Sequence, residues 1–156
     1  LARERMAEST AEPAVIPRLL HYVLVTVARP SRPANLSAAY DTWLRSCAAA
    51  NPAFRVLLWS RDDCARLATT RHATLAPFYA SLAEHGVIRQ ADFCRLMVLS
   101  SFGGVYLDLD VLCLRPLEPL RRHALFVADE PDAHKRRWGR KSASPFPCNA
   151  VMGSTA

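Results

Sequence analysis

Residues 92–120 read DFCRLMVLSSFGGVYLDLDVLCLRPLEPL, and within them Asp108 and Asp110 stand one residue apart in an apolar run. Carboxylates buried among apolar side chains are costly unless they bind a partner or a cation. Because side-chain direction repeats every two residues along a strand, a continuous strand over residues 105–114 would point both aspartates the same way. Two such oxygen donors suit Mg²⁺ or Mn²⁺, with substrate phosphates completing the shell. The alternative is a strand end whose aspartates simply reach solvent.

Upstream of this pair, Asp92 and Arg95 lie three residues apart on a helix predicted over residues 88–101, so they share one helix face. Beside a metal site such a polar pair could grip sugar hydroxyls, although an isolated pair of this kind is more often an ordinary surface ion pair. Gly103 and Gly104 end the predicted helix, and we expect a positive φ at one of them.

Strands and helices alternate outward from this segment. The predicted strands cover residues 16–27, 54–59, 105–114, 124–128 and 148–153. The predicted helices cover residues 36–50, a segment capped by Ser60, residues 74–85 and residues 88–101. Residues 129–147 are predicted to be a polar loop, and residues 1–14 a disordered leader. This order indicates an α/β fold with a largely parallel sheet in one domain over residues 15–156.

The composition excludes some classes of protein. With 51% hydrophobic residues among 156, the chain can bury a core and is not disordered as a whole. No apolar run approaches the roughly 20 residues of a spanning helix, and the first residues have no signal-peptide pattern. The formal charge of +6 comes almost wholly from Arg. Without a nucleic-acid-binding motif, this charge favours a small anionic ligand or an anionic surface, and residues 134–141 are either a solvated loop or a contact for an anionic acceptor.

Single residues give smaller signals. The five cysteines have no metal-ligand spacing, and their odd number fits a reduced protein or a disulfide network with one thiol left over. We expect most of them to be small buried hydrophobic residues. His21 stands inside an apolar strand and is expected to be a hydrogen-bonded core residue, while Trp59 belongs either to the core or to the edge of the site.

Taken together, these motifs resemble the family-32 glycosyltransferases that carry a D-x-D sugar-binding region. Residues 16–21 resemble the family's opening I-P-K-x-I-H strand, and residues 51–59 resemble its second strand after N-P. Residues 91–95 resemble S-D-x-x-R, and residues 102–110 resemble (Y/F)-G-G-(I/V)-Y-x-D-x-D. Asn149 resembles the asparagine of a later strand, whereas Leu24 stands where the family usually has a Trp suited to stacking on the nucleotide base.

The resemblance implies a GT-A fold over residues 15–156, truncated at its C-terminal end and holding the donor-binding part. It also implies retaining transfer of a hexose, with mannose or galactose favoured, from a GDP- or UDP-sugar to a glycan or glycolipid. Mn²⁺ or Mg²⁺ would be the cofactor, and no nucleic acid would take part. The location would be the lumenal side of a Golgi or secretory-pathway membrane in a eukaryote, or the cytoplasm in a bacterium, with membrane association through segments outside this chain.

The resemblance assigns roles to individual residues. It implies three catalytic residues: Asp108, Asp110 and Asn149. It implies that five residues bind the donor sugar or nucleotide: Asp92, Arg95, Gly104, Tyr106 and Asp108. It implies that the metal ligands are Asp108 and Asp110.

Two other classes of function stay open. A phosphohydrolase of the haloacid-dehalogenase type also places D-x-D after an apolar strand, with the first aspartate as nucleophile and the second as acid and base. Only about 46 residues follow Asp110, however, and they contain no convincing acidic pair of the kind that class needs. A noncatalytic, Arg-rich anion-binding module would explain the charge, but it leaves the two aspartates unexplained.

Overall fold

The computed structural model describes residues 15–25, 37–139 and 144–156, so the predicted leader over residues 1–14 and the end of the basic stretch at residues 140–141 lie outside the described residues. The strands are β1 (Leu19–Leu24), β2 (Arg55–Ser60), β3 (Gly104–Leu107), β4 (Leu125–Asp129) and β5 (Pro147–Ser154). The α-helices are α1 (Ala38–Ala50), α2 (Arg61–Arg71), α3 (Ala76–Ser81), α4 (Val87–Phe102) and α5 (Asp132–Arg137). Two short 3₁₀ helices are η1 (Leu82–His85) and η2 (Glu118–Arg122).

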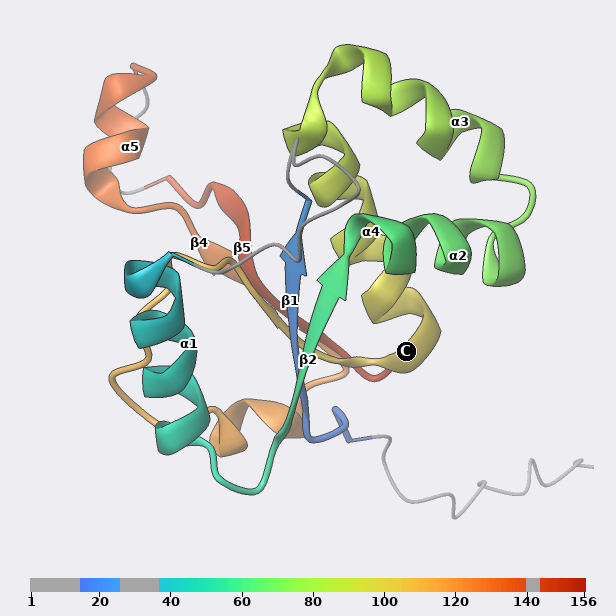
Figure 1. The fold of residues 1–156 in the computed structure, drawn as a ribbon. Helices are drawn as coiled ribbons and strands as arrows, with labels where there is room; N and C mark the ends of the chain where they lie inside the picture. The colour runs from blue at the N-terminus through green and yellow to red at the C-terminus, as the bar shows by residue number, and fades with distance from the viewer. Residues whose placement is uncertain (1–14, 26–36, 140–143) are drawn as a thin grey trace, which may run out of the picture.

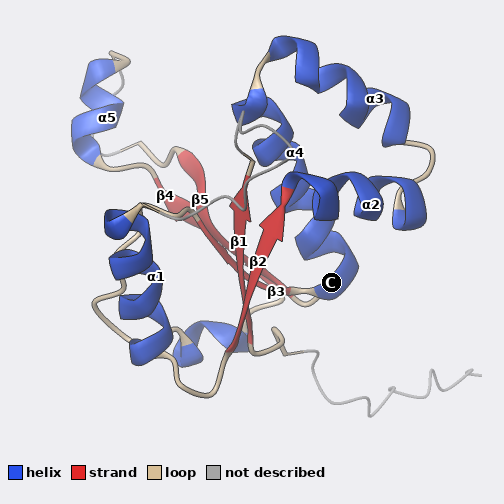
Figure 2. Cartoon of the chain, viewed as in Figure 1, coloured by secondary structure: helices blue, strands red, loops and turns tan. Residues whose placement is uncertain are grey.

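The five strands of the described residues form one sheet in the order β2-β1-β3-β5-β4 (Figure 2). β1 pairs in parallel with β2 and with β3, while β5 pairs antiparallel with both β3 and β4. β4 therefore runs in the same direction as β1, β2 and β3, and β5 alone is reversed. The prediction of an α/β fold with a mostly parallel sheet is confirmed.

Helices cover both faces of this sheet (Figure 1). On the α1 side, Leu20, Val105 and Leu107 pack with Cys47 of α1 in one buried cluster. On the other side, Val23 and Tyr106 pack with residues of α2, α3 and α4. Because side chains alternate along each strand, β1 and β3 supply both cores. Among the described helices, none combines the length and the apolar character needed to cross a bilayer.

Local sequence signals set the ends of the helices. Ser60 caps α2 by accepting a hydrogen bond from the backbone of Asp63, whose side chain accepts one from the backbone of Ser60 in return. α4 ends at Gly103, where φ is +62°, and Gly104 follows with φ of +95°. The expected cap at Ser60 and the expected positive φ after α4 are both confirmed.

The predicted strand over residues 105–114 is too long. β3 ends at Leu107, and although the amide of Asp108 still donates to Ala150 of β5 (2.8 Å), the amide of Val111 turns back to the carbonyl of Asp108 (3.1 Å). The chain then leaves the sheet for α1, where Cys113 forms a disulfide with Cys47. Both aspartates consequently follow the carboxyl end of a strand instead of lying inside one.

The predicted polar loop over residues 129–147 also needs correction, because it contains α5. Lys135 of this helix is buried and forms an ion pair with Asp129 at the end of β4. A buried ammonium requires a partner of this kind. The ion pair therefore links α5 to the sheet, although the segment is polar in sequence.

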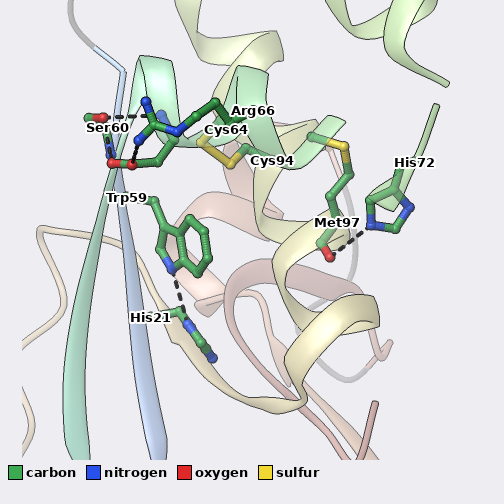
Figure 3. The surroundings of a disulfide bond; sticks show 9 residues. His21, Trp59, Ser60, Cys64, Arg66, His72, Cys94 and Met97 are labelled. Carbon is green, nitrogen blue, oxygen red and sulfur yellow. Dashed lines mark hydrogen bonds and ion pairs between the residues drawn. A yellow bond between two sulfur atoms is a disulfide. The ribbon is translucent and has the colours of Figure 1, made fainter. Parts of the chain in front are cut away.

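Four of the five cysteines form disulfides. Cys47 pairs with Cys113, and Cys64 of α2 pairs with Cys94 of α4 (Figure 3). Cys148 is the free thiol. The expectation that most cysteines are simple buried hydrophobic residues is wrong for these pairs, although three of the four paired side chains are indeed fully buried.

Candidate functional site

A cleft of about 470 Å³ opens at the carboxyl ends of β1 and β3. The chain crosses from β1 to β2 on one side and returns through α2, α3 and α4 to β3 on the other side, so the strand order reverses between β1 and β3. In open α/β sheets, ligands bind at such a switch point, outside the carboxyl ends of the strands. The ends of both strands, the start of α4 and Tyr40 of α1 line this cleft.

Arg95 of α4 is the central residue of the cleft wall. Its side chain is only 6% exposed, and its Nη2 lies 2.8 Å from Oδ1 of Asp92 while its Nη1 lies 3.1 Å from Oδ1 of Asp108. Nη1 also donates to the carbonyl of Asn149 on β5 (2.7 Å). The guanidinium carbon sits 4.6 Å from the centre of the Tyr106 ring. Two carboxylates and an aromatic face thus compensate a charge that would otherwise be costly to bury.

Asp108 is held from two directions. The Tyr106 hydroxyl donates to Oδ1 of Asp108 (2.6 Å), on the same oxygen that faces Arg95. Burial raises the pKa of Asp108, and the hydrogen bond from Tyr106 and the charge of Arg95 offset part of that effect. Among the described residues, Oδ2 of Asp108 has no hydrogen-bond partner. One oxygen is therefore fixed by the protein, and the other is left for a ligand.

Asp110 lies in the turn after β3 and is exposed. Its negative charge contributes to the raised pKa of Asp108, so the two carboxylates repel each other. Within the described residues there is no group of three or more His, Cys, Asp or Glu side chains that could hold a metal ion. Mg²⁺ in nucleotide sites is commonly bound by one or two carboxylates together with substrate phosphates. The pair at the end of β3 fits that kind of donor set.

Asn149 completes the group from the reversed strand. Its Nδ2 donates to Oδ1 of Asp92 (3.2 Å), across 57 residues of sequence. Five of the residues singled out from the sequence therefore lie in one connected network: Asp92, Arg95, Tyr106, Asp108 and Asn149. We call these five residues the Arg95 network.

Gly104 does not belong to this network. It begins β3, at the opposite end of the strand from Asp108. A Cβ on Gly104 would lie 2.8 Å from Nε2 of His21 and 2.9 Å from the carbonyl oxygen of Leu19. The close approach that excludes a side chain at Gly104 is therefore packing against β1, not contact with the cleft.

His21 is fully buried on β1, as expected of a core histidine. Its Nε2 lies 2.9 Å from the carbonyl oxygen of Gly103, and the indole Nε1 of Trp59 donates to its Nδ1 (3.1 Å; Figure 3). These partners fit the neutral ring with its proton on Nε2. Burial lowers the pKa of His21 to about 4, which keeps the ring neutral at physiological pH.

Tyr40 is a residue of the cleft that the sequence did not single out. It lies in the first turn of α1, is 37% exposed and lines the cleft together with Leu24. The signal that could have found it is an aromatic residue at the start of the first helix, since loops and helix starts at the carboxyl edge of a sheet line its crevice. Tyr40 thus offers the aromatic surface that Leu24 does not.

Comparison with known proteins gives a consistent assignment. The family model described as glycosyltransferase sugar-binding region containing DXD motif matches residues 37–127. Inositol phosphoceramide mannosyltransferase 3 of Schizosaccharomyces pombe is 28% identical over 90% of this chain and 33% of its own length. Mannosyl phosphorylinositol ceramide synthase SUR1 of Saccharomyces cerevisiae is 26% identical over 94% of this chain and 33% of its own length. The chain thus spans about a third of these relatives.

A solved structure shares the fold. PaToxG glycosyltransferase superposes with a TM-score of 0.51 over 67% of this chain and 46% of its own chain, at 17% sequence identity. At that identity the likeness concerns the arrangement of helices and strands alone. It agrees with the expected fold class.

Proposed function

The chain belongs to the family of glycosyltransferases whose sugar-binding region contains a DXD motif, and from this premise we propose that it forms the donor-binding part of a metal-dependent hexosyltransferase. The donor is a nucleotide-diphosphate sugar. The observation that carries the proposal is the Arg95 network, because it fixes Asp92 and Asp108 beside a cleft at the switch point of the sheet. Polar groups held this rigidly suit recognition of one ligand geometry.

The names of the relatives support mannose as the sugar and a phosphoinositol-bearing ceramide as the acceptor. Both yeast relatives named above, and a second mannosyltransferase of Schizosaccharomyces pombe at 25% identity, carry these terms in their names. We adopt mannose and an anionic glycolipid for this chain, with galactose as the alternative sugar. The net charge of +6 is compatible with an anionic acceptor and an anionic donor.

The chemistry of the cleft supports one arrangement of the donor. Its diphosphate would lie at Asp108 and Asp110, the residues that would hold Mn²⁺ or Mg²⁺, and the bound ion would neutralise the charge on the leaving group. Tyr40 stacks on the base from the α1 side of the cleft. The sugar hydroxyls lie near Asp92, whose side chain is 42% exposed. Arg95 is too deeply buried to grip the sugar alone, so we assign it the role of positioning Asp92 and Asp108.

The reaction proceeds with retention at the anomeric carbon. The bond from that carbon to the diphosphate oxygen breaks, the bond to the acceptor hydroxyl oxygen forms on the same face, and the hydroxyl proton passes to the leaving phosphate. The carboxylates of the cleft are engaged with Arg95 or lie with the proposed metal, which leaves none placed as a double-displacement nucleophile among the described residues. Asn149 holds Asp92 in place through its side-chain amide.

The two disulfides support an oxidising compartment, because such bonds persist in secretory and extracellular spaces and are rare in the cytosol. We therefore propose a lumenal location in the secretory pathway in place of the cytoplasmic alternative. Alkylation of the unreduced, denatured protein followed by mass spectrometry tests this state. Modification of Cys148 alone is the expected result, and modification of all five cysteines in protein isolated from its own compartment would contradict it.

A thermal-shift panel tests the proposed function. GDP-mannose, UDP-galactose, GDP and UDP are each compared with and without Mn²⁺, and we expect the largest stabilisation from GDP-mannose with metal. The same protein is assayed for salt-sensitive DNA binding and for Mg²⁺-dependent hydrolysis of a phosphate monoester. Positive results there, with no response to any nucleotide sugar, would favour the anion-binding module or the phosphohydrolase instead.

A further inference from the structure

A second hollow adjoins the Arg95 network: Asp92 and Asn149 line this hollow, whereas Arg95, Tyr106 and Asp108 line the cleft. Its volume is about 240 Å³. Its walls include Phe78, Phe93 and Leu96, and its polar end consists of Arg89, Asp92 and Asn149. We call these six residues the α4 groove.

The apolar walls of the α4 groove face solvent. Phe78 and Leu96 are each 53% exposed, although both are large hydrophobic residues. The rings of Phe78 and Phe93 meet edge to face, with their centres 5.3 Å apart, so the two side chains form one aromatic wall. On α4 the lining residues fall at positions 89, 92, 93 and 96, which form one stripe along the helix. The groove is therefore an exposed apolar surface along α4.

The polar end of the groove is continuous with the site. Asp92 accepts from Asn149 (3.2 Å) and pairs with Arg95 (2.8 Å), which in turn reaches Asp108 in the cleft. Arg89 is exposed and forms no ion pair among the described residues. A ligand in the groove could thus contact Phe78 and Leu96 with an apolar portion and Arg89 with an anionic group. The part of the ligand beyond the anionic group would then reach the Arg95 network.

We infer that the α4 groove binds the lipid portion of the acceptor, with Arg89 facing the head-group phosphate and the acceptor sugar or inositol directed toward Asp92. The inference rests on the lipid acceptor of the proposed function. Three features select this occupant: an apolar wall that is open to solvent, an unpaired cation at its end and direct continuity with the donor-binding residues. A water-soluble glycan would satisfy only the last of these.

Binding of short-chain inositol phosphoceramides below their micelle concentration tests this assignment by calorimetry on the chain itself. Each methylene added to the acyl group is expected to tighten the dissociation constant by up to about fourfold until the groove is filled. Free inositol phosphate is expected to bind far more weakly. Equal affinity for the lipid and for inositol phosphate would overturn the inference.

Point variants distinguish lipid binding in the α4 groove from a general affinity of the protein for lipids. Leu96→Ser is expected to weaken lipid binding about tenfold, whereas Leu114→Ser, a change at a leucine that is 83% exposed outside the groove, leaves it unchanged. Arg89→Gln is expected to weaken the phosphate-bearing lipid more than a neutral ceramide. Equal effects of the two leucine variants, or equal losses for the charged and neutral lipids on Arg89→Gln, would contradict the assignment.

Two further measurements distinguish a failure of the groove assignment from a failure of the proposed function. Stabilisation by GDP-mannose with Mn²⁺ is expected to be the same in Leu96→Ser and in the unaltered chain, because the groove lies outside the donor cleft. Loss of that response in the unaltered chain would reject the proposed function, not the groove alone. Self-association that Leu96→Ser abolishes, seen by sedimentation, would make a second copy the occupant and overturn the inference.

Discussion

The indole of Trp59 donates a hydrogen bond to Nδ1 of His21 at 3.1 Å, linking the neighbouring strands β2 and β1 inside the molecule (Figure 3). Nε2 of the same ring faces the carbonyl of Gly103, at the end of α4. The two ring nitrogens of the neutral histidine therefore connect β1 with β2 and with the end of α4. Protonation of Nδ1 would turn its N–H toward the indole N–H of Trp59, so that two hydrogen-bond donors would face each other.

Acid should destabilise the fold through His21. Its pKa is about 4 in the folded protein and 6.5 in an unfolded chain. Between these values the unfolded state binds more protons, so the free energy of unfolding decreases as pH falls from 6.5 to 4, by about 3 kcal/mol in all. Urea unfolding at several pH values measures this slope. His21→Gln should flatten it, and an unchanged slope in that variant would assign the acid sensitivity to other groups.

Asp110→Asn should remove the metal-dependent part of donor binding and leave the fold intact. Asp110 is exposed, so the change removes a ligand charge without disturbing the core. The melting temperature without ligand should shift by less than about 1 °C, whereas stabilisation by GDP-mannose with Mn²⁺ should disappear. Glu84→Gln, at another exposed acid, is the control. Donor binding that survives in Asp110→Asn with its full metal requirement would show that this carboxylate is not a ligand.

Arg95→Lys should reveal a positioning role. A lysine keeps the positive charge but lacks the planar fork that reaches Asp92, Asp108 and the Asn149 carbonyl together. Stability should fall by about 3 kcal/mol. Affinity for the nucleotide sugar should fall about tenfold more than affinity for the nucleotide diphosphate, because Asp92 loses its orientation. Equal losses for both ligands in titrations would make Arg95 purely structural.

Tyr40→Ala should weaken every nucleotide that binds in the cleft. Stacking of a base on an aromatic ring contributes about 1–3 kcal/mol, which corresponds to roughly 5–150-fold in affinity. Since Tyr40 would contact the base and not the sugar, GDP and GDP-mannose should be affected alike. Tyr40→Phe keeps the ring and should bind normally. Normal GDP binding by Tyr40→Ala would remove Tyr40 from the base site.

Gly104→Ala should destabilise the protein more than Gly139→Ala. Both glycines have positive φ, at +95° and +68°, but only Gly104 is enclosed, whereas a Cβ on Gly139 meets nothing within 4 Å. The alanine at Gly139 should cost about 1 kcal/mol from backbone strain. At Gly104 the contacts with Leu19 and His21 should raise the cost to about 3 kcal/mol or more. Similar melting temperatures for the two variants would mean that β1 and β3 can move apart there.

Several parts of the site could be predicted from sequence because they are local patterns. The three-residue spacing of Asp92 and Arg95 fixes a common helix face, and Gly103 and Gly104 mark the positive φ that follows this helix. Asp92 and Arg95 form an ion pair, and both glycines have positive φ. The contact with Asn149 is not local, and it was accessible only through resemblance to a family.

Other features depended on tertiary structure. Residues 108–114 have the apolar character of a strand, but their path is set by the disulfide to α1 and by the hydrogen bond from Leu117 to the Asn51 side chain (2.7 Å). Cysteine spacing does not determine pairing, so neither disulfide could be read from the sequence. The burial of Arg95 likewise follows from packing among α4, β3 and β5. In the proposed function, this burial favours a role for Arg95 in positioning its neighbours over the expected role in holding the sugar.

The position of β5 governs the order in which the molecule can assemble during synthesis. β5 is the last strand along the described chain, yet it lies between β3 and β4 in the sheet. Until residues 147–154 leave the ribosome, β3 has an unpaired edge and Arg95 lacks its contact with Asn149. Pairings over such long sequence separations form slowly, and open strand edges favour aggregation. A nascent chain halted before residue 147 would accordingly need a chaperone more than its size suggests.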